Sequence, residues 1–214
     1  MLKDIPMFDT ETGVSTLVLR EIPYRRCAYV RVHSVQAGGL GEHLRECISF
    51  CRMCGAELVY ATGCDGLETY PVYCSVLTMS AELEDREHAA TLVPVTEETV
   101  SHWRRLCNEK MASVDNAATL EARQEKEILS SGGAYFIHDA GKLLGIGWLR
   151  GSEVLAVAAV ERGAGERVLR TLLTAADADR ATLDVASTNL RAIRLYERMG
   201  FLTVGEKSRW HQIF

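Results

Sequence analysis

The sequence has no apolar run long enough to cross a bilayer, and it begins MLKDIPMFDTETG, without the apolar core of a secretory signal. Basic residues are outnumbered as well. The chain has 24 Lys and Arg against 29 Asp and Glu, which gives a formal net charge of -5. An acidic chain has no long-range attraction for nucleic acid or anionic lipid. We therefore predict a cytoplasmic protein with neither nucleic acid nor a membrane as its partner.

Cysteines are numerous but are not arranged as a disulfide framework. There are seven, an odd number, and without a signal peptide we expect reduced thiols. Cys47, Cys51 and Cys54 are spaced to lie on one helix face. One interpretation is a metal site built on CRMC, with His43 and Cys64 as further ligands. The other is that small apolar residues pack a helix against a sheet. We favour packing and predict no metal site, because structural zinc pairs usually lie in turns.

A polar stretch, SAELEDREHAA at 80–90, divides the chain into two parts. It predicts one domain over 1–89 and another over 90–214. In the second part, hydrophobic periodicity and turn residues predict alternating strands and helices, with a hairpin turning at 139–141. The predicted elements are a strand at 91–95, helices at 97–111 and 118–129, strands at 134–139, 142–151 and 153–160, a helix at 166–176, a strand at 181–186, a helix at 189–199, and a final strand pair ending at 214.

The two parts contain similar segments. GLGEHLR begins at Gly39 and GAGERVL begins at Gly163, an offset of 163 − 39 = 124. Around both segments the pattern is strand, glycine turn, helix, strand, with matched lengths. This suggests that the first part is a degenerate copy of half of the second domain, although glycine turns before helices also recur by chance. At the same offset Asp65 and Val72 replace Asn189 and Tyr196, so a degenerate copy would have kept the scaffold and lost the site.

The second part contains two stretches that suggest chemistry. The strand VLAVAAV leads into ERGAGERVL, where a glycine turn and a helix N-terminus together suit an anion such as a pyrophosphate. The stretch STNLRAIRLYERMGF forms a helix whose inner face carries Asn189, Ala192 and Tyr196. A helix that served only for packing would not need Asn and Tyr there.

The second part resembles the GNAT superfamily of acyl-CoA-dependent N-acyltransferases. The resemblance lies in the order of a strand, the GAG turn, a helix, the strand TLDVAS, the pattern N-x-x-A-x-x-x-Y and the pair G-F. The resemblance covers about Thr91 to Phe214 and is strongest from Val154 to Phe201. It implies an α/β (α+β) fold: a mixed, largely antiparallel sheet flanked by helices, preceded by a smaller GNAT-like α/β half domain. It also implies transfer of acetyl from acetyl-CoA to a primary amine, on a small molecule or a peptide, by direct attack in a ternary complex. A homodimer is compatible with it.

The resemblance assigns a role to each matching residue. Pantetheine would bind the backbone in the gap between the strands at 154–160 and 182–186. The N–H of Ala158 would stabilise the oxyanion. Asn189 would hold the cofactor arm, Ala192 would let it pass, and Tyr196 would protonate the departing sulfur, unless it is simply a core tyrosine. The residues expected to bind coenzyme A are Val157, Ala158, Ala159, Val160, Arg162, Gly163, Ala164, Gly165, Glu166, Arg167, Val168, Asn189, Ala192 and Tyr196.

The sequence departs from the family in one place. The family turn reads Arg/Gln-x-x-Gly-x-Gly/Ala, and Val160 stands where Arg or Gln is usual. Arg162 or Arg167 would have to compensate for it. The general base is open, since Glu153, His138 and Asp139 all have the character of surface residues. The alternative function is therefore a non-catalytic coenzyme A binder or scaffold.

Overall fold

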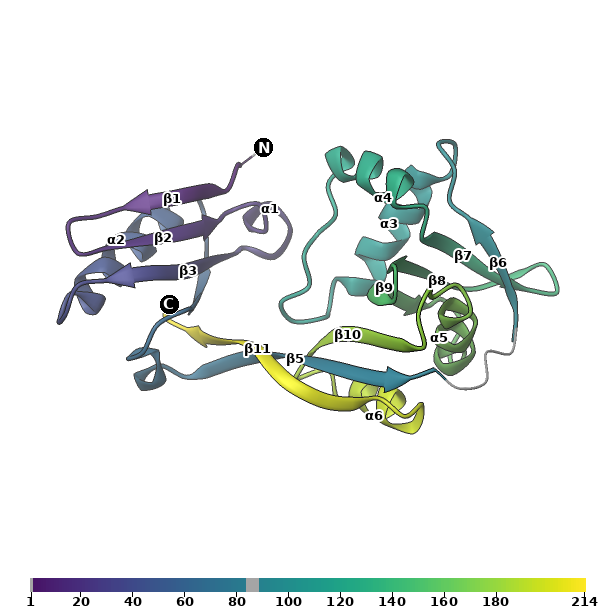
Figure 1. Cartoon of the computed structure of the whole chain (residues 1–214). Coiled ribbons are helices and arrows are strands. Elements are labelled where there is room, and N and C mark those ends of the chain that lie inside the picture. Colours follow the sequence, from purple (N-terminus) through teal and green to yellow (C-terminus); the bar gives the residue numbers. More distant parts are fainter. Residues whose placement is uncertain (1, 84–88) are drawn as a thin grey trace. The chain divides into compact units, whose positions relative to one another are not determined.

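The computed structural model describes residues 2–83 and 89–214 (Figure 1). Its strands form one sheet of eleven, in the order β1-β2-β3-β4-β11-β5-β10-β9-β8-β7-β6. Most neighbouring pairs with assigned register are antiparallel, and two pairs, β3 with β4 and β9 with β10, are parallel. The predicted fold class, a mixed and largely antiparallel sheet flanked by helices, is confirmed.

The chain forms two compact units. One contains the residues up to Val76 together with Glu206–Phe214, and the other contains Leu77–Gly205. Of the polar stretch at 80–90, residues 84–88 lie outside the described residues, while its first three residues belong to strand β5, Val72–Glu82. The domain boundary at 89–90 stays a prediction.

The first unit is built around a strand-helix-strand segment. Strands β3 and β4 are parallel and are joined through helix α2, with five residue pairs from Cys27↔Leu58 to Arg31↔Thr62. The unit's elements are β1 (Ile5–Asp9), β2 (Gly13–Val18), α1 (Ile22–Arg25), β3 (Cys27–Val35), α2 (Leu40–Met53), β4 (Leu58–Thr62) and η1 (Leu67–Thr69).

Helix α2 packs its cysteines into the core of this unit. Cys47 and Cys51 are fully buried with Leu44 among the apolar residues of the strands. Burial raises the pKa of Cys47 to about 11 and that of Cys51 to about 12, so both thiols stay protonated. They act as small core residues. Within 2–83 and 89–214, no three His, Cys, Asp or Glu side chains are grouped as a metal site would need.

The second unit follows the predicted order of elements. These are β6 (Thr91–Pro94), α3 (Val100–Met111), η2 (Ala122–Gln124), α4 (Glu125–Ser131), β7 (Ala134–Asp139), β8 (Lys142–Arg150), β9 (Glu153–Ala159), α5 (Gly165–Leu173), β10 (Arg180–Ala186) and α6 (Leu190–Arg198). The hairpin turns as predicted, with positive φ at Ala140 (47°) and Gly141 (78°). The predicted final strand pair is wrong, because one long strand, β11 (Leu202–Gln212), follows α6.

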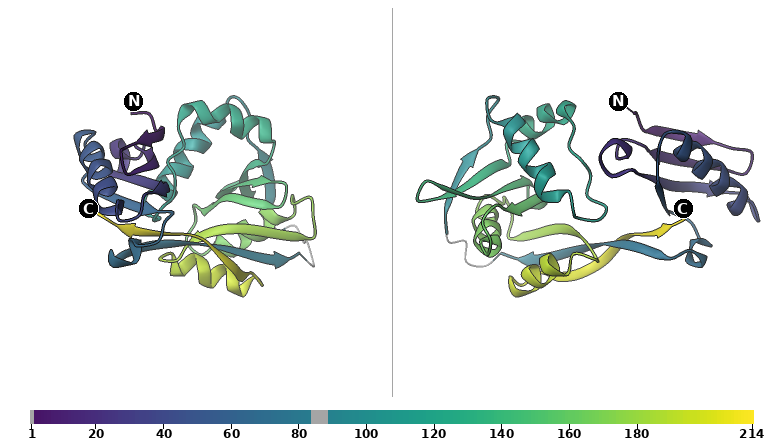
Figure 2. Two further views of the ribbon diagram at one scale, coloured as in Figure 1. Left: turned by 60° about the vertical axis from the view of Figure 1, so that its left-hand side comes forward. Right: turned by 180° about the vertical axis from the view of Figure 1, so that it is seen from behind.

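Helices cover both faces of the sheet in the second unit (Figure 1 and Figure 2). Helices α5 and α6 pack on one face around Leu169, Leu172 and Phe201. Helices α3 and α4 pack on the other around Trp103, Ile128 and Trp148. In the described residues, no helix is both long and apolar enough to cross a membrane.

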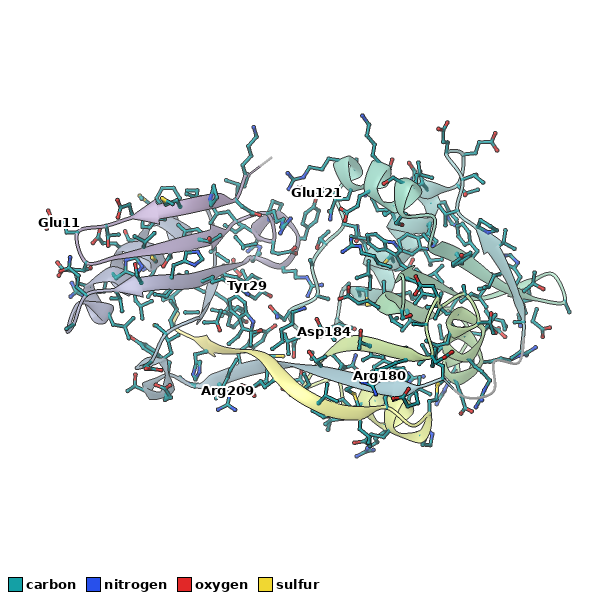
Figure 3. The ribbon with its side chains drawn as sticks, in the orientation of Figure 1. Glu11, Tyr29, Glu121, Arg180, Asp184 and Arg209 are labelled. Carbon is teal, nitrogen blue, oxygen red and sulfur yellow. The ribbon has the colours of Figure 1, made fainter. Side chains whose placement is uncertain are left out.

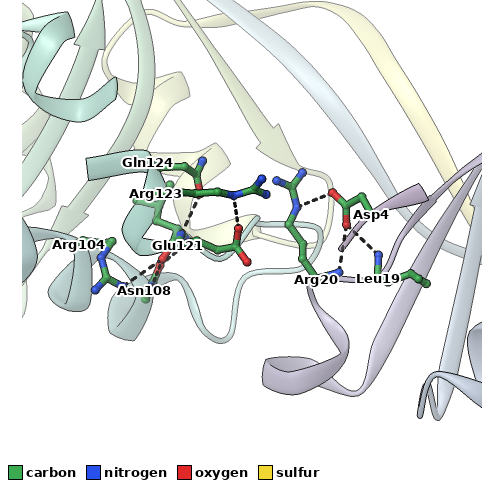
Figure 4. Close-up of polar contacts among 9 residues, drawn as sticks. Asp4, Leu19, Arg20, Arg104, Asn108, Glu121, Arg123 and Gln124 are labelled. Atoms are coloured by element: carbon green, nitrogen blue, oxygen red, sulfur yellow. Dashed lines mark hydrogen bonds and ion pairs between the residues drawn. The ribbon is translucent and has the colours of Figure 1, made fainter. Parts of the chain in front are cut away.

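Side chains anchor the turns of both units to their helices and strands (Figure 4). In the second unit the amide of Asn108 binds both the N–H and the C=O of Leu120, at 2.9 Å each, and so fixes the segment between α3 and α4. Glu121 and Gln124 then form a capping box before α4. In the first unit, Asp4 accepts hydrogen bonds from the backbone N–H groups of Leu19 and Arg20, at 3.0 and 3.1 Å.

Two strands are shared reciprocally by the units. The end of β11 belongs to the first unit, where His211 pairs with Ala61 of β4. The end of β5 belongs to the second unit, where the Thr78 hydroxyl donates to Asp184 of β10 at 2.8 Å. Each unit is therefore completed by a strand that begins in the other.

The helices and strands of the two segments align along the sequence at the predicted offset of 124 residues. Moving β4 by 124 residues places it on 182–186, inside β10, and moving α2 places it on 164–177, which contains α5. Both segments join parallel neighbouring strands. In the first unit, the short helix η1 and then β5 stand where α6 lies in the second. That one segment is a degenerate copy of the other stays a prediction.

A buried histidine joins α2 to the neighbouring strands. His43 is fully buried, with Nε2 at 2.6 Å from the Ser15 hydroxyl and Nδ1 at 2.8 Å from the Thr10 hydroxyl. Burial lowers its pKa below the ordinary value of 6.5, although the carboxylates of Glu46 and Asp9 act in the opposite direction. The imidazole is thus held neutral in the core.

We expect the first unit to lose stability as the pH falls below about 6.5. The unfolded chain binds the proton more readily than the folded one, so the free energy of unfolding decreases toward acid, by at most about 1.4 kcal/mol per pH unit for one proton. Urea unfolding followed by Trp fluorescence from pH 8 to 5 measures this. His43→Gln removes the titrating group and should flatten that part of the slope. An unchanged slope would contradict the assignment.

Candidate active site

A bulge in β9 opens the sheet beside β10. Trp148 of β8 pairs with Ala156 and Leu149 pairs with Val154, so Leu155 is an extra residue on β9. A bulge bends its strand and increases the local twist. In the described residues β9 and β10 pair only at Glu153↔Thr182 and Val154↔Leu183. Beyond these pairs the two parallel strands separate, and the edge of β9 toward β10 has no strand partner.

The register decides which backbone groups of β9 face this gap. The N–H of Val160 donates to Leu144 of β8 at 2.8 Å. A Cβ added to Gly145 of β8 would lie 2.4 Å from the carbonyl oxygen of Ala158, so that carbonyl points to β8. In an antiparallel pair the N–H and C=O of one residue point the same way, and they alternate along the strand. Ala158 therefore faces β8, while Val157 and Ala159 face the gap.

The turn after β9 leads directly into helix α5. Gly163 has a φ of +89°, which favours glycine, and a Cβ on Gly165 would lie 3.1 Å from Leu195 of α6. Helix α5 has Ala164 as its N-cap and no side-chain cap. The first N–H groups of a helix have no partner within it and carry the positive end of its dipole. This turn is thus suited to bind an anion.

The basic residues of the turn differ in availability. Arg167 forms an ion pair with Asp139 and donates to the carbonyl of Ala89 at 3.0 Å, so its guanidinium is already engaged. Arg162 is exposed and has no ion pair within 2–83 and 89–214. Glu166 pairs with Arg170, one turn further along α5. Of the two arginines expected to compensate for Val160, Arg167 is thus engaged by other groups, and that either of them compensates stays a prediction.

Helix α6 begins at the predicted asparagine. The side-chain oxygen of Asn189 accepts from the N–H of Ala192 at 3.2 Å, which caps the helix. The adjacent Thr188 hydroxyl donates to Asp115 at 2.7 Å, tying the segment between α3 and α4 to the start of α6. Capping uses the oxygen of the Asn189 amide, and no hydrogen bond to its nitrogen lies within the described residues.

Tyr196 is a buried residue whose hydroxyl forms no hydrogen bond with the described residues. Its side chain is 8% exposed and its ring packs 6.0 Å from that of Phe201. No hydrogen bond to the hydroxyl exists within 2–83 and 89–214. Burial raises its pKa to about 12, so the hydroxyl keeps its proton at any working pH. The ring belongs to the core, but the hydroxyl lacks the partner that a purely structural buried tyrosine usually has.

The predicted site residues gather around the gap. Val157, Ala159, Ala164, Ala192 and Tyr196 all belong to the apolar cluster between α5, α6 and the sheet. Because β9 and β10 are parallel, the turn before α5 and the start of α6 lie at the same end of the two strands.

Other predicted candidates lie elsewhere. Glu153 is at the paired end of β9, and Asp139 is engaged by Arg167. His138 lies beside Asp139 near the β7–β8 hairpin. On β8, the strand next to β9, Trp148 is a core residue that packs against Trp103 and donates to Ser131 at 2.9 Å. Sequence reasoning passed over Asp184, the acidic residue of TLDVAS, whose only signal is a charge within an otherwise apolar strand.

The site thus combines a sheet that opens between two parallel strands, the N-terminus of α5 and a tyrosine on α6, and this arrangement is suited to an extended anionic ligand. The sequence model of the Acetyltransferase (GNAT) family matches residues 83–201, which is more than half of the sequence. The chain belongs to this family.

Solved structures support the same fold over nearly the whole chain. A GCN5-related N-acetyltransferase from Sphaerobacter thermophilus has a TM-score of 0.61 at 14% identity, covering 94% of this chain and 75% of its own. One from Kribbella flavida has a TM-score of 0.58 at 14% identity, covering 96% and 88%. A GNAT-family acetyltransferase from Colwellia psychrerythraea has a TM-score of 0.53 at 14% identity, covering 96% and 84%. Among curated proteins, none matches.

The two functions of the Asn189 amide are separable by substitution. Asn189→Ala removes the cap of α6 and should lower the free energy of unfolding by about 1 kcal/mol. Asn189→Asp keeps an oxygen for the Ala192 N–H and should retain most of that stability, while removing the amide donor. Chemical denaturation of the three proteins measures this. Equal stability of Asn189→Ala and wild type would show that the cap contributes nothing.

Proposed function

We propose that this protein is an N-acetyltransferase that moves acetyl from acetyl-CoA to a primary amine in a ternary complex. The observation that carries the proposal is the separation of β9 from β10 beyond Val154↔Leu183. It leaves backbone donors and acceptors along one edge of β9 for an extended ligand, at the end of the strands where α5 begins. Family membership supports the acetyl donor.

The residues at the gap suit coenzyme A. The uncapped start of α5 and the turn at Gly163 present N–H groups to a pyrophosphate. Arg162 adds a positive charge at the same turn, where the family's Arg or Gln is absent. The gap-facing backbone of Val157 and Ala159 matches the amide groups of pantetheine. The free amide nitrogen of Asn189 is available to the same arm.

The same geometry suits acyl transfer. Bound acetyl-CoA supplies an activated thioester. We assign the oxyanion donor to the gap-facing N–H of Val157 or Ala159 in place of Ala158, whose backbone faces β8. The ammonium group first loses a proton to water, and the neutral amine nitrogen then forms the new C–N bond. The C–S bond breaks, a second proton leaves the nitrogen to water, and the coenzyme A thiolate takes up a proton from water. Tyr196 donates a hydrogen bond to the departing sulfur.

The raised pKa of Tyr196 limits what it contributes. A thiol has a pKa of about 8.5, so complete transfer of a proton from a phenol near 12 to a free thiolate is uphill. The hydroxyl is therefore most effective as a hydrogen-bond donor to the sulfur while negative charge develops on it. Its neutral state at all working pH values ensures that the proton is present.

A second candidate is a GNAT scaffold that binds coenzyme A without catalysis. Val160 in the place of the usual Arg or Gln favours it, because one side-chain contact to the phosphates is lost. Binding of acetyl-CoA without turnover on any of a broad panel of amines would support this candidate over the enzyme.

Coenzyme A should bind through the turn at Arg162. Calorimetric titration of coenzyme A into wild type and Arg162→Ala should show binding that weakens by about tenfold, since a charge-assisted hydrogen bond contributes about 1.5–3 kcal/mol. Arg170→Ala removes the same charge from α5, the helix that follows the turn, at a residue paired with Glu166, and should leave the Kd unchanged. No binding by folded wild type would refute the proposed function.

Tyr196→Phe should separate catalysis from binding. Loss of a hydrogen-bond donor to developing charge lowers rates by about 10²-fold or more, while the Kd for coenzyme A should change little because the ring remains. In wild type, kcat should show no alkaline decline up to pH 10 from Tyr196, since burial raises its pKa to about 12. Steady-state kinetics with an accepted amine test both points, and unchanged turnover in the variant would exclude this role.

A further inference from the structure

One carboxylate lies at the point where the two strands part. Asp184 is the first residue of β10 beyond the last pair, Val154↔Leu183. Its neighbours Leu183 and Val185 are buried against α5 and α6, so alternation along the strand directs Asp184 to the opposite face. It is exposed there, on the same strand as Arg180 (Figure 3). This is the face of the sheet that α3 and α4 cover further along.

We propose that Asp184 binds and orients the ammonium group of the acceptor, and so restricts the enzyme to aliphatic primary amines with no carboxylate beside the nitrogen. This inference rests on the proposed function. With Tyr196 packed on the α6 side of the sheet, an amine that attacks the thioester from the other side reaches the gap past Asp184.

The described residues of β9 and β10 offer no second carboxylate at the point of separation, and Asp115, from the segment between α3 and α4, accepts from Thr188 beyond the end of β10. Beyond the bulge, the residues of β9 that contact the α3 cluster are Ala156 and Ala158, which are apolar. Glu153 is also acidic, but it lies in the paired part of β9, behind the point of separation. Arg180, the cation on the same strand, forms an ion pair with Glu82. Asp184 is thus the carboxylate at the mouth of the gap.

A strand that begins in the first unit fixes this carboxylate. The hydroxyl of Thr78 on β5 donates to Oδ1 of Asp184 at 2.8 Å. A hydrogen bond from a hydroxyl restricts the rotation of the carboxylate. Thr78 is therefore a positioning residue, which acts through Asp184.

The chemistry of the pair defines the role. An alkylammonium has an ordinary pKa of about 10.4, so the acceptor arrives as a cation. A carboxylate at this point attracts that cation and aligns its nitrogen. The proton then leaves to water. A carboxylate on the acceptor next to its amine would be repelled, which disfavours free α-amino acids.

Binding can be measured without knowing the natural acceptor. Saturation-transfer NMR with n-butylammonium, in the presence of saturating coenzyme A, should give a signal for wild type that is lost in Asp184→Asn. Asp184→Glu should restore part of it. Glu82→Gln, which removes a carboxylate from the neighbouring strand, is the matched control and should keep the full signal. The neutral n-butanol should give none with any of the proteins.

Turnover gives an independent readout. With n-butylamine as acceptor, Asp184→Asn should raise KM by about tenfold with a smaller change in kcat, and Thr78→Val should raise KM less. The KM of wild type should rise with salt concentration, and that of Asp184→Asn should not. A folding defect would instead reduce the fraction of active enzyme. It would lower the apparent kcat and leave KM unchanged.

The outcomes distinguish the role of Asp184 from the proposed function on which it rests. If wild type fails to bind coenzyme A, both hypotheses are refuted. If coenzyme A binds but n-butylammonium gives no signal, or the same signal with Asp184→Asn, the role of Asp184 is refuted and the proposed function stands. Preferential acetylation of α-amino acids would also refute it.

Discussion

The site depends on a failure of strand pairing. Parallel neighbours in a sheet normally pair along their shared length, and β3 and β4 do so over five residues in the first unit. In the second unit the corresponding strands pair over two residues and then part at the bulge around Leu155. Backbone groups shielded from water without a partner cost about 1–3 kcal/mol each, so the open edge of β9 is a place where a ligand with amide groups gains affinity. The two repeated segments differ most in this feature.

The opened sheet needs support from the side that faces away from β9, and reciprocal strand sharing supplies it. Strand β10 is bounded by β5, which carries Thr78 to Asp184 and Glu82 to Arg180. Strand β11, which begins in the second unit, pairs with β4 in the first unit. Loss of either strand would therefore affect both units. If the first segment is a degenerate copy, as the sequence predicts, this gives a physical reason for it to persist with Asp65 and Val72 in place of Asn189 and Tyr196.

The sequence predicted the elements around the site better than the groups that face it. Glycines, the Asn189 cap and helical periodicity are local signals, and they placed the turn, α5 and α6 within a few residues. The bulge at Leu155 has no such signal, because VLAVAAV is uniformly apolar, so the orientation of Ala158 toward β8 could not be foreseen. The pairing of Arg167 with Asp139 and of Thr78 with Asp184 joins residues 28 and 106 apart, and only the fold brings such groups together.

Under the proposed function, the two faces of the sheet have different roles in acyl transfer. On the α6 face, an apolar environment keeps Tyr196 protonated and leaves its hydroxyl without a partner, which suits a donor to a soft, developing sulfur anion. On the other face, Asp184 is exposed and hydrogen-bonded, which suits a charge that must meet a hydrated cation. In one pocket the two groups would interfere with each other. The Asp184 carboxylate would accept a hydrogen bond from the Tyr196 hydroxyl, which would then not be available to the sulfur. A sheet opened between parallel strands lets both act on one thioester while remaining separated by the backbone.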